Sequence, residues 1–166
     1  YTVAVTRAAS SDATLSALTL SQGSLSPNFV SGTLAYTASV PYSVSSLVVT
    51  PTVNDANASA TVNGASAATP VTLSVGSNTV TVQVTAQDGS TQSYTVAVTR
   101  AASSDATLSA LTLSQGSLSP NFVSGTLAYT ASVPYSVSSL VVTPTVNDAN
   151  ASATVNGASA ATPVTL

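Results

Sequence analysis

An exact internal repeat constrains this chain more than any other feature. Laying the sequence on itself at an offset of 93 residues makes Tyr1–Leu73 identical to Tyr94–Leu166, without one substitution. A period of 93 is too long for a solenoid, whose units of about 20–50 residues cannot bury a core alone. It suits an autonomous β-sandwich of about 100 residues. The sequence therefore predicts a window of a tandem array of self-contained modules.

The repeat also predicts the domain boundaries. Residues 12–100 form one complete module, and residues 101–104 form a connector. Residues 105–166 repeat the module without its last two strands, and residues 1–11 match the last strand and connector of a preceding module. The connector at Ala8–Asp12, AASSD, is too short to act as a floppy linker, so we expect neighbouring modules to be partly fixed in orientation.

Alternation of apolar and polar residues predicts strands throughout, and no stretch has a helical period. Asn78–Ala86 places valines at 80, 82 and 84 on one face, and Tyr94–Arg100 places Tyr94, Val96 and Val98 inward. Tyr1–Arg7 has the sequence of the second of these strands. Five further strands are predicted at Ala13–Leu20, Thr33–Val40, Ser46–Val53, Ala58–Val62 and Thr69–Val75, the last with Val71, Leu73 and Val75 inward.

Turn residues separate these strands. Asn63-Gly64 predicts a type I′ turn, and Asp88-Gly89 predicts a hairpin. Pro51 lacks an N–H, so we expect it at a sheet edge or a bulge, and Leu25 and Phe29 are expected to close one end of the core. About seven strands with turns every 8–12 residues predict an all-β, immunoglobulin-like antiparallel sandwich.

Composition excludes several classes of function. The chain has two cations and five anions, and it contains no His, Cys, Met, Trp, Lys or Glu. Nucleic-acid binding and attraction to an anionic membrane both need Lys or Arg. Without Cys and His, the chain has no residues for disulfides, for zinc ligation or for general base catalysis near neutral pH. No apolar run reaches 18 residues, so no membrane-inserting segment is predicted.

The few charged residues suggest candidate sites, each with a simpler interpretation. Asp55 and Asp88 could serve a glycosidase only if they flanked a cleft. Asn54-Asp55-Ala56-Asn57 could be a calcium corner, but Asn and Asp also cap turns, which we favour. Arg7 and Arg100 could form ion pairs with Asp12 or Asp105 that fix the inter-module angle, or they could be solvated strand ends. We therefore predict no catalytic, cofactor-binding or metal-ligating residue.

Three surface features allow other interpretations. Thr79, Thr81 and Thr85 could form a binding array, although Thr is favoured on any wet strand face. Asn57-Ala58-Ser59 matches a glycosylation sequon. Tyr42 is the loop aromatic that a glycan-binding platform would use, so a buried Tyr42 would weaken that interpretation.

Four segments resemble a known family: DATLSALTLSQGSLSPNF at Asp12–Phe29, LAYTASVP at Leu34–Pro41, TVNG at Thr61–Gly64, and VGSNTVTVQVTAQDGSTQSYTVAVTR at Val75–Arg100. They are similar to the cadherin-like β-sandwich domain of bacterial secreted and surface proteins. The resemblance implies tandem modules in a large extracellular protein without catalytic residues. The resemblance does not imply calcium binding, since each junction between modules offers too few carboxylates to hold the ion.

The predicted function is a structural module of an extracellular or cell-surface array: a fibre, stalk, adhesin or self-assembling filament. The alternative is a glycan- or ligand-binding module of a secreted protein, and no enzyme activity is expected. Expected partners are neighbouring identical modules in the same chain or in adjacent subunits. In the second case Tyr1–Arg7 of one copy would add to the open sheet of residues 105–166 in the next.

Overall fold

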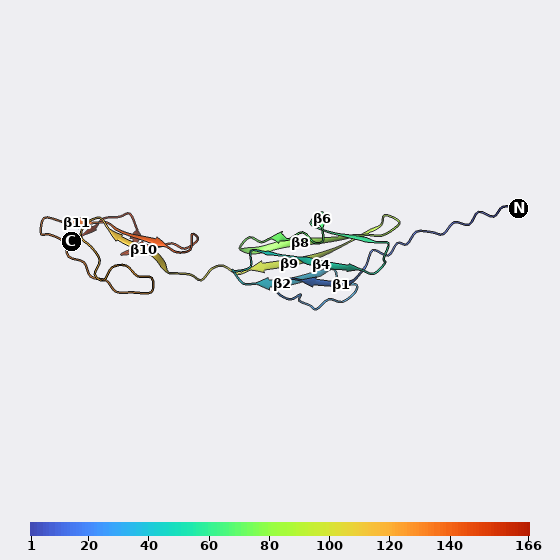
Figure 1. Cartoon of the computed structure of the whole chain (residues 1–166), viewed down its shortest axis with the longest axis horizontal. Helices are drawn as coiled ribbons and strands as arrows, with labels where there is room; N and C mark the ends of the chain where they lie inside the picture. The colour runs from blue at the N-terminus through green and yellow to red at the C-terminus, as the bar shows by residue number, and fades with distance from the viewer. The chain divides into compact units, whose positions relative to one another are not determined.

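The computed structural model describes residues 1–166 and divides them into two compact units, Tyr1–Ala102 and Ser103–Leu166 (Figure 1). Both units consist of strands and turns, which confirms the all-β prediction, and no helix suited to crossing a membrane is found. The first unit contains β1 (Leu15–Leu20), β2 (Ala35–Val40), β3 (Ser46–Leu47), β4 (Val49–Val53), β5 (Ser59–Val62), β6 (Ala65–Ser66), β7 (Val71–Thr72), β8 (Gly76–Thr85) and β9 (Thr91–Arg100). The second unit contains β10 (Leu108–Leu113), β11 (Ser139–Leu140), β12 (Val142–Val146), β13 (Thr154–Val155), β14 (Ala158–Ser159) and β15 (Val164–Thr165).

A five-stranded sheet forms one layer of the first unit, in the order β2-β9-β8-β5-β6. β8 and β9 have ten residues each and pair antiparallel along their whole length. β2 instead runs parallel to β9, from Ala35 opposite Thr95 to Val40 opposite Arg100. The predicted sandwich is therefore antiparallel except for this pair. A parallel pair is accessible here because the two strands are far apart in sequence and are not joined by a hairpin.

The other layer consists of two short antiparallel pairs, β1 with β4 and β3 with β7. Ser46–Val53 was expected as one strand, but it divides at Val48 because that residue exchanges hydrogen bonds with Ser21 (2.9 Å each). Pro51 lies in β4, whose only partner is β1. Its place on an edge confirms the prediction.

The core of the first unit lies between these layers. The side chains of Val80, Val82 and Val84 on β8 and of Tyr94, Val96 and Val98 on β9 are 0% exposed, as predicted. The Tyr94 hydroxyl accepts a hydrogen bond from the Leu15 N–H (3.0 Å) and so links the two layers. Phe29 stacks on Tyr36 with ring centroids 6.0 Å apart. Leu25 and Phe29 pack half-buried against the core, which confirms their predicted role. The seventeen buried side chains are hydrophobic: Ala13, Leu15, Leu18, Tyr36, Ala38, Val40, Leu47, Val49, Val62, Leu73, Val80, Val82, Val84, Ala86, Tyr94, Val96 and Val98.

The turns agree with their sequence signals, with one exception nearby. Asn63 and Gly64 have φ of 48° and 77°, as a type I′ turn requires, and they connect β5 to β6. The Asp88-Gly89 hairpin joins β8 to β9 as predicted. Val75, expected inward, is 46% exposed because it lies in a bend before β8, where the strand alternation is interrupted.

The second unit repeats residues 12–73 but has no counterpart of β8 and β9. It keeps the short pairs β10–β12, β11–β15 and β13–β14. The counterpart of β2, residues 128–133, forms no strand because its parallel partner β9 is absent. No side chain of this unit is fully buried.

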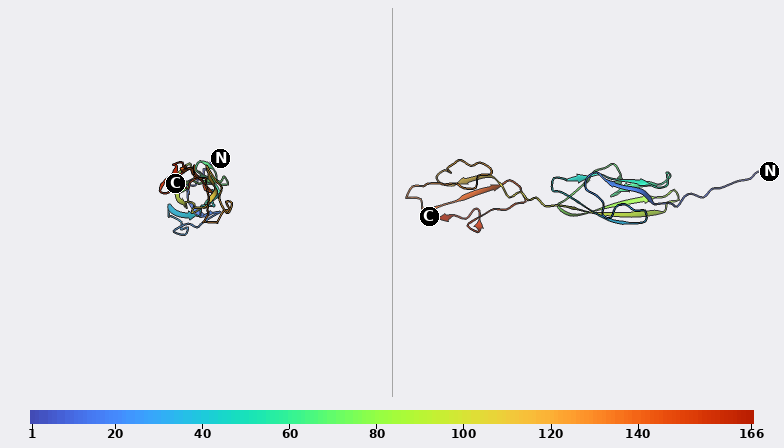
Figure 2. Two further views of the ribbon diagram at one scale, coloured as in Figure 1. Left: turned by 90° about the vertical axis from the view of Figure 1, so that its left-hand side faces the viewer. Right: turned by 90° about the horizontal axis from the view of Figure 1, so that it is seen from below.

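The predicted strand at Tyr1–Arg7 is not formed in this structure. The segment is exposed, pairs with nothing, and is drawn without a strand arrow in the right-hand view of Figure 2. Its identical copy, Tyr94–Arg100, is a strand because β8 and β2 flank it.

Candidate functional site: the two ends of the first unit

The chain enters the first unit at Ser10–Asp12, which lies against the tip of the β8–β9 hairpin. The Asp88 N–H donates to the Ser10 carbonyl (3.0 Å), and the Ser10 N–H donates to Oε1 of Gln87 (3.1 Å). The Ser90 hydroxyl donates to the Ser11 carbonyl (3.3 Å). The connector is thus part of the module that follows it.

Asp12 closes this entry. Its Oδ1 accepts hydrogen bonds from the Thr14 hydroxyl (2.6 Å) and N–H (2.9 Å), and its Oδ2 accepts one from Nδ2 of Asn54 (2.8 Å). These bonds favour the charged carboxylate, so they lower the pKa of Asp12, the Thr14 hydroxyl most of all. Asp105 makes the same bonds to Thr107 and Asn147 in the second unit.

Asp55 and Asp88 stabilise turns beside the entry. Asp55 accepts from the N–H and Nδ2 of Asn57 (2.9 Å each), and Asp88 accepts from the Ser90 hydroxyl (2.6 Å) and N–H (2.9 Å). Hydrogen bonds lower the pKa of both, foremost from Ser10 to Asp55 and from Ser90 to Asp88. The turn-capping interpretation of Asp55 is confirmed. A glycosidase needs one carboxyl with a raised pKa, which is the opposite of what these two show.

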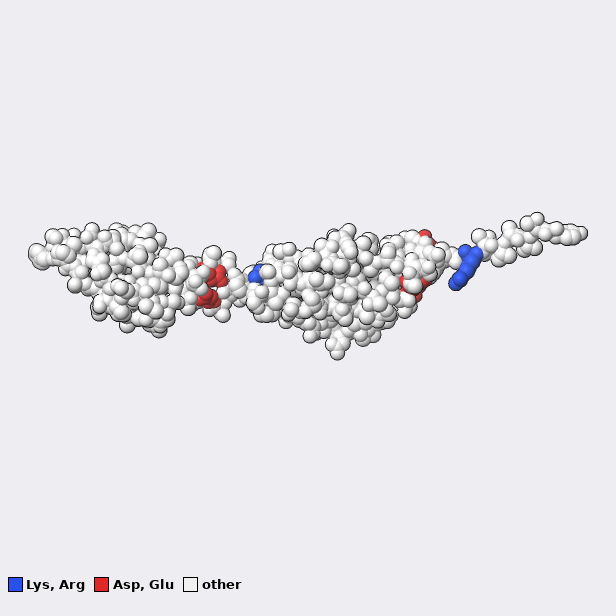
Figure 3. All heavy atoms as spheres, in the orientation of Figure 1, with Lys and Arg blue, Asp and Glu red and all other residues white.

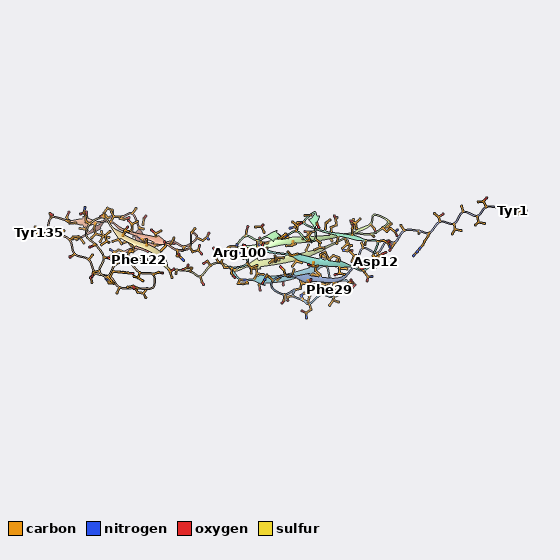
Figure 4. The ribbon with its side chains drawn as sticks, viewed as in Figure 1. Tyr1, Asp12, Phe29, Arg100, Phe122 and Tyr135 are labelled. Carbon is orange, nitrogen blue, oxygen red and sulfur yellow. The ribbon has the colours of Figure 1, made fainter.

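The chain leaves at Arg100, at the opposite end of the unit from Asp12 (Figure 4). The Arg100 guanidinium donates two hydrogen bonds to the Tyr42 carbonyl (2.6 and 3.0 Å) and one to the Leu73 carbonyl (3.0 Å). It also lies 4.8 Å from the centre of the Tyr42 ring, within cation–π range. Ala101 adds a backbone hydrogen bond to Val40 (2.9 Å). Hydrogen bonds to the first unit therefore hold the chain at its exit as well as at its entry.

The solvated-strand-end interpretation of Arg100 is wrong, because its guanidinium is half-buried and donates three hydrogen bonds to carbonyl oxygens of the first unit. A sequence cannot reveal such partners, since every residue has a carbonyl. Arg7, identical in sequence, is exposed.

Tyr42 is half-buried in the first unit, and Arg100 covers one side of its ring. The residue is not buried, so the glycan-binding alternative stays a prediction. The counterpart in the second unit, Tyr135, is fully exposed.

The acidic side chains of the first unit and a polar pocket lie at the same end of that unit. The acidic side chains of the first unit gather at its entry, near Arg7 (Figure 3). A polar pocket of about 490 Å³ lies there, lined by Arg7–Ser10, Asp55, Asn57 and Gln87. No three His, Cys, Asp or Glu side chains come together as a metal site would require. The donors and acceptors at the entry hold the chain itself.

The sequence reasoning missed Asn78, at the start of β8. Its Nδ2 donates to the carbonyls of Ser74 (2.8 Å) and Gly76 (3.0 Å), and its Oδ1 accepts from the Ser74 N–H (2.8 Å). An Asn directly after a Gly-Ser turn is the signal that could have indicated this cap.

Comparison with known proteins identifies the nature of the modules. The family model described as "Cadherin-like beta sandwich domain" matches residues 15–101 and again residues 108–166. A protein of Evansella cellulosilytica named "Putative membrane protein" is 37% identical over 97 residues, which is 55% of this chain. The chain spans 15% of the length of that relative.

Proposed function

Since the chain belongs to the family of cadherin-like beta sandwich domains, we propose that it is a spacer segment of an extracellular array of identical modules, such as a surface fibre, stalk or adhesin. The family is a structural, non-enzymatic one. The bacterial relative named as a membrane protein supports presentation of the array at a cell surface. A spacer must hold its ends apart and must resist being pulled open.

One observation carries this proposal: the charged side chains of the first unit are used at the points where the chain enters and leaves. Asp12, Asp55 and Asp88 secure Ser10–Asp12 and the adjacent turns, and Arg100 secures the exit. In a complete repeat only Ala102 would separate Ala101, which bonds to Val40 of one module, from Ser103, the counterpart of Ser10. Such a short free segment suits a rod-like array.

The direction of the strands suits the same role. Entry lies beside the start of β9 and exit lies at its end, so the two points are about 33 Å apart along ten residues. A pulling force on the chain ends acts along β9 and shears its hydrogen bonds to β8 and β2 together. Loading many bonds at once, rather than one after another, gives a module mechanical resistance.

Single-molecule pulling on the full chain, held by its two termini, tests the spacer role. We expect one high-force event as the first unit unfolds, with a length gain of about 290 Å for Asp12–Arg100 at about 3.6 Å per residue less the folded length. The second unit should extend at low force and serves as the internal control. A first unit that opens in several small low-force steps would contradict a force-resisting spacer.

A further inference from the structure

Ser10 and Ser11 are held against the tip of the β8–β9 hairpin by hydrogen bonds. The Ser10 N–H and carbonyl bond to Gln87 and Asp88 (3.1 and 3.0 Å), and the Ser11 carbonyl accepts a bond from the Ser90 hydroxyl (3.3 Å). We call Ser10–Ser11 the entry strap. Neither of its residues is buried, so water can replace each partner when the strap lifts off.

The folded core begins directly after the entry strap. Asp12 bonds to Thr14 and Asn54, and the Asn54 N–H donates to the Thr14 carbonyl (3.0 Å). Ala13 and Leu15 are 8% and 1% exposed, and β1 starts at Leu15. Lifting the strap therefore breaks no strand pairing and uncovers no core residue, and Asp12 is the point at which the lifting stops.

The Ser10 hydroxyl connects the entry strap to two acidic residues. It accepts a hydrogen bond from the Asp12 N–H (3.3 Å) and donates one to the Asp55 carboxylate, where it is the foremost cause of the lowered pKa. Ser103 bonds in the same way to Asp105 and Asp148 in the second unit. The N–H, the carbonyl and the hydroxyl of Ser10 are thus all engaged, which makes this residue the centre of the strap.

The exit of the first unit is built differently from its entry. Arg100 ends β9, which pairs with both β8 and β2, and the Ala101 N–H bonds to Val40. Detaching the exit would break strand pairs, whereas detaching the entry strap breaks only isolated bonds. A pull on the chain loads those isolated bonds in turn, first at Ser10 and then at Ser11. The entry is therefore the part of the folded unit that opens most easily.

We propose that the entry strap opens and recloses on the folded module, with Ser10 as the residue that positions it. Opening frees two residues, about 7 Å of chain, at each entry. This inference rests on the proposed array role for its meaning, because each entry then lengthens under tension before any module unfolds. The two fail separately: a strap that never opens leaves the high-force unfolding of the first unit unchanged, and a weak first unit leaves strap opening measurable without force.

Hydrogen exchange of the full chain, followed by NMR at urea concentrations below the unfolding transition, measures the opening. The Asp88 N–H reports on the strap because it donates to the Ser10 carbonyl, and the Ala86 N–H reports on the hairpin because it donates to the Ser90 carbonyl (2.8 Å). After correction for intrinsic rates, we expect Asp88 to exchange at least tenfold faster than Ala86. The Asp88 rate should not depend on urea, whereas the rates of Val80 and Val82 in β8 should rise with it.

A pair of serine variants tests the role of Ser10. Ser10→Ala removes the hydroxyl alone, and it should lower the protection of the Asp88 N–H at least fivefold and raise the carboxyl titration midpoint of Asp55. Ser11→Ala is the matched control: it removes an exposed hydroxyl and keeps the carbonyl that Ser90 uses. It should change the protection of Asp88 less than twofold.

Three results would overturn the proposal. Equal exchange of Asp88 and Ala86 would mean that the hairpin frays as a whole. A urea dependence of Asp88 equal to that of Val80 would mean that the strap opens only on global unfolding. Unchanged Asp88 protection in Ser10→Ala, or an equal loss of protection at Asp88 and Val80, would mean that Ser10 does not position the strap.

Discussion

The two units carry the same residues in two different states of burial. Residues 105–166 repeat residues 12–73 without a change, yet Leu73 is 2% exposed and its counterpart Leu166 is 60% exposed. Leu15 is 1% exposed, while Leu108 is half-buried. The difference shows that an apolar pattern is not sufficient for a core. β8 and β9 supply the other half of the contacts.

Local contacts do not depend on that core. Phe122 and Tyr129 stack at 6.0 Å and 24°, as Phe29 and Tyr36 do. The turn at Asp105 keeps its bonds as well. What disappears is long-range pairing, above all the strand at residues 128–133. Short-range hydrogen bonds thus shape each turn, and distant strands decide whether the turns enclose a core.

The largest expected effect comes from giving the second unit its missing strands. A chain extended after Leu166 by a copy of Ser74–Arg100 should bury the apolar side chains of Leu108, Leu111 and Leu127 and should form a strand at residues 128–133. At about 0.7 kcal/mol per residue near 60 °C, calorimetry should show roughly 60 kcal/mol of added unfolding enthalpy. An extension with scrambled sequence is the control. An enthalpy that does not rise would mean that burial in the first unit has another origin.

One substitution made in both copies measures the difference directly. Leu15→Ala removes a buried side chain and should destabilise the first unit by about 2–5 kcal/mol. Leu108→Ala, the same change in the same sequence, should leave the unfolding transition of the first unit within about 0.5 kcal/mol. Urea denaturation of the two variants gives both values. Equal effects would contradict the comparison.

The two arginines offer a second matched pair. Arg100→Ala removes three hydrogen bonds and a cation–π contact, so it should cost the first unit about 1–3 kcal/mol. Arg7→Ala should cost close to nothing because Arg7 is exposed. Arg100→Lys keeps the charge but not the planar fork, and it should restore the stability only in part. Thermal unfolding measures the stability of the three variants. Equal melting temperatures for Arg100→Ala and Arg7→Ala would show that the contacts of Arg100 do not stabilise the first unit.

Acid should affect the two units through the same local bonds. The pKa values of Asp12 and Asp105 both lie below the ordinary 3.8, chiefly because of the hydroxyls of Thr14 and Thr107. A carboxyl whose pKa is lowered by folding contributes stability above its unfolded pKa and loses it as the pH falls through the folded value. Stability should thus be flat from about pH 8 to 5 and should decline below about pH 4. Carboxyl titration by NMR should give midpoints below 3.8 in both units; a normal midpoint in the second would show that the core, not the turn, lowers the pKa.

Chelation should produce the smallest effect. The carboxylates at Asp12 and Asp105 already accept bonds from neighbouring Thr and Asn side chains, so EDTA should change the melting temperature of neither unit. A shift of several degrees that Ca²⁺ reverses would indicate a calcium site at these ends.

The sequence predicted those features that depend on residue type. Asn63-Gly64 formed its turn because glycine tolerates positive φ and Asn tolerates it better than most other residues. The valines of β8 and β9 turned inward because strand alternation is local. The parallel pairing of β2 with β9 could not be predicted, since either direction satisfies the same pattern. The role of Arg100 depends on two carbonyls brought close only by the fold.

The fixed exit at Arg100 also has a consequence for proteolysis. Arg7 and Arg100 are the only basic residues of the chain, so a trypsin-like protease has two bonds to cut, after each of them. At Arg100 the side chain is held by carbonyls and the next N–H by Val40, so cleavage requires the end of β9 to detach first. At Arg7 the same peptide sequence is open to the enzyme. A trypsin-like protease should therefore cut after Arg7 long before it cuts after Arg100, which protects the complete module from this class of enzyme.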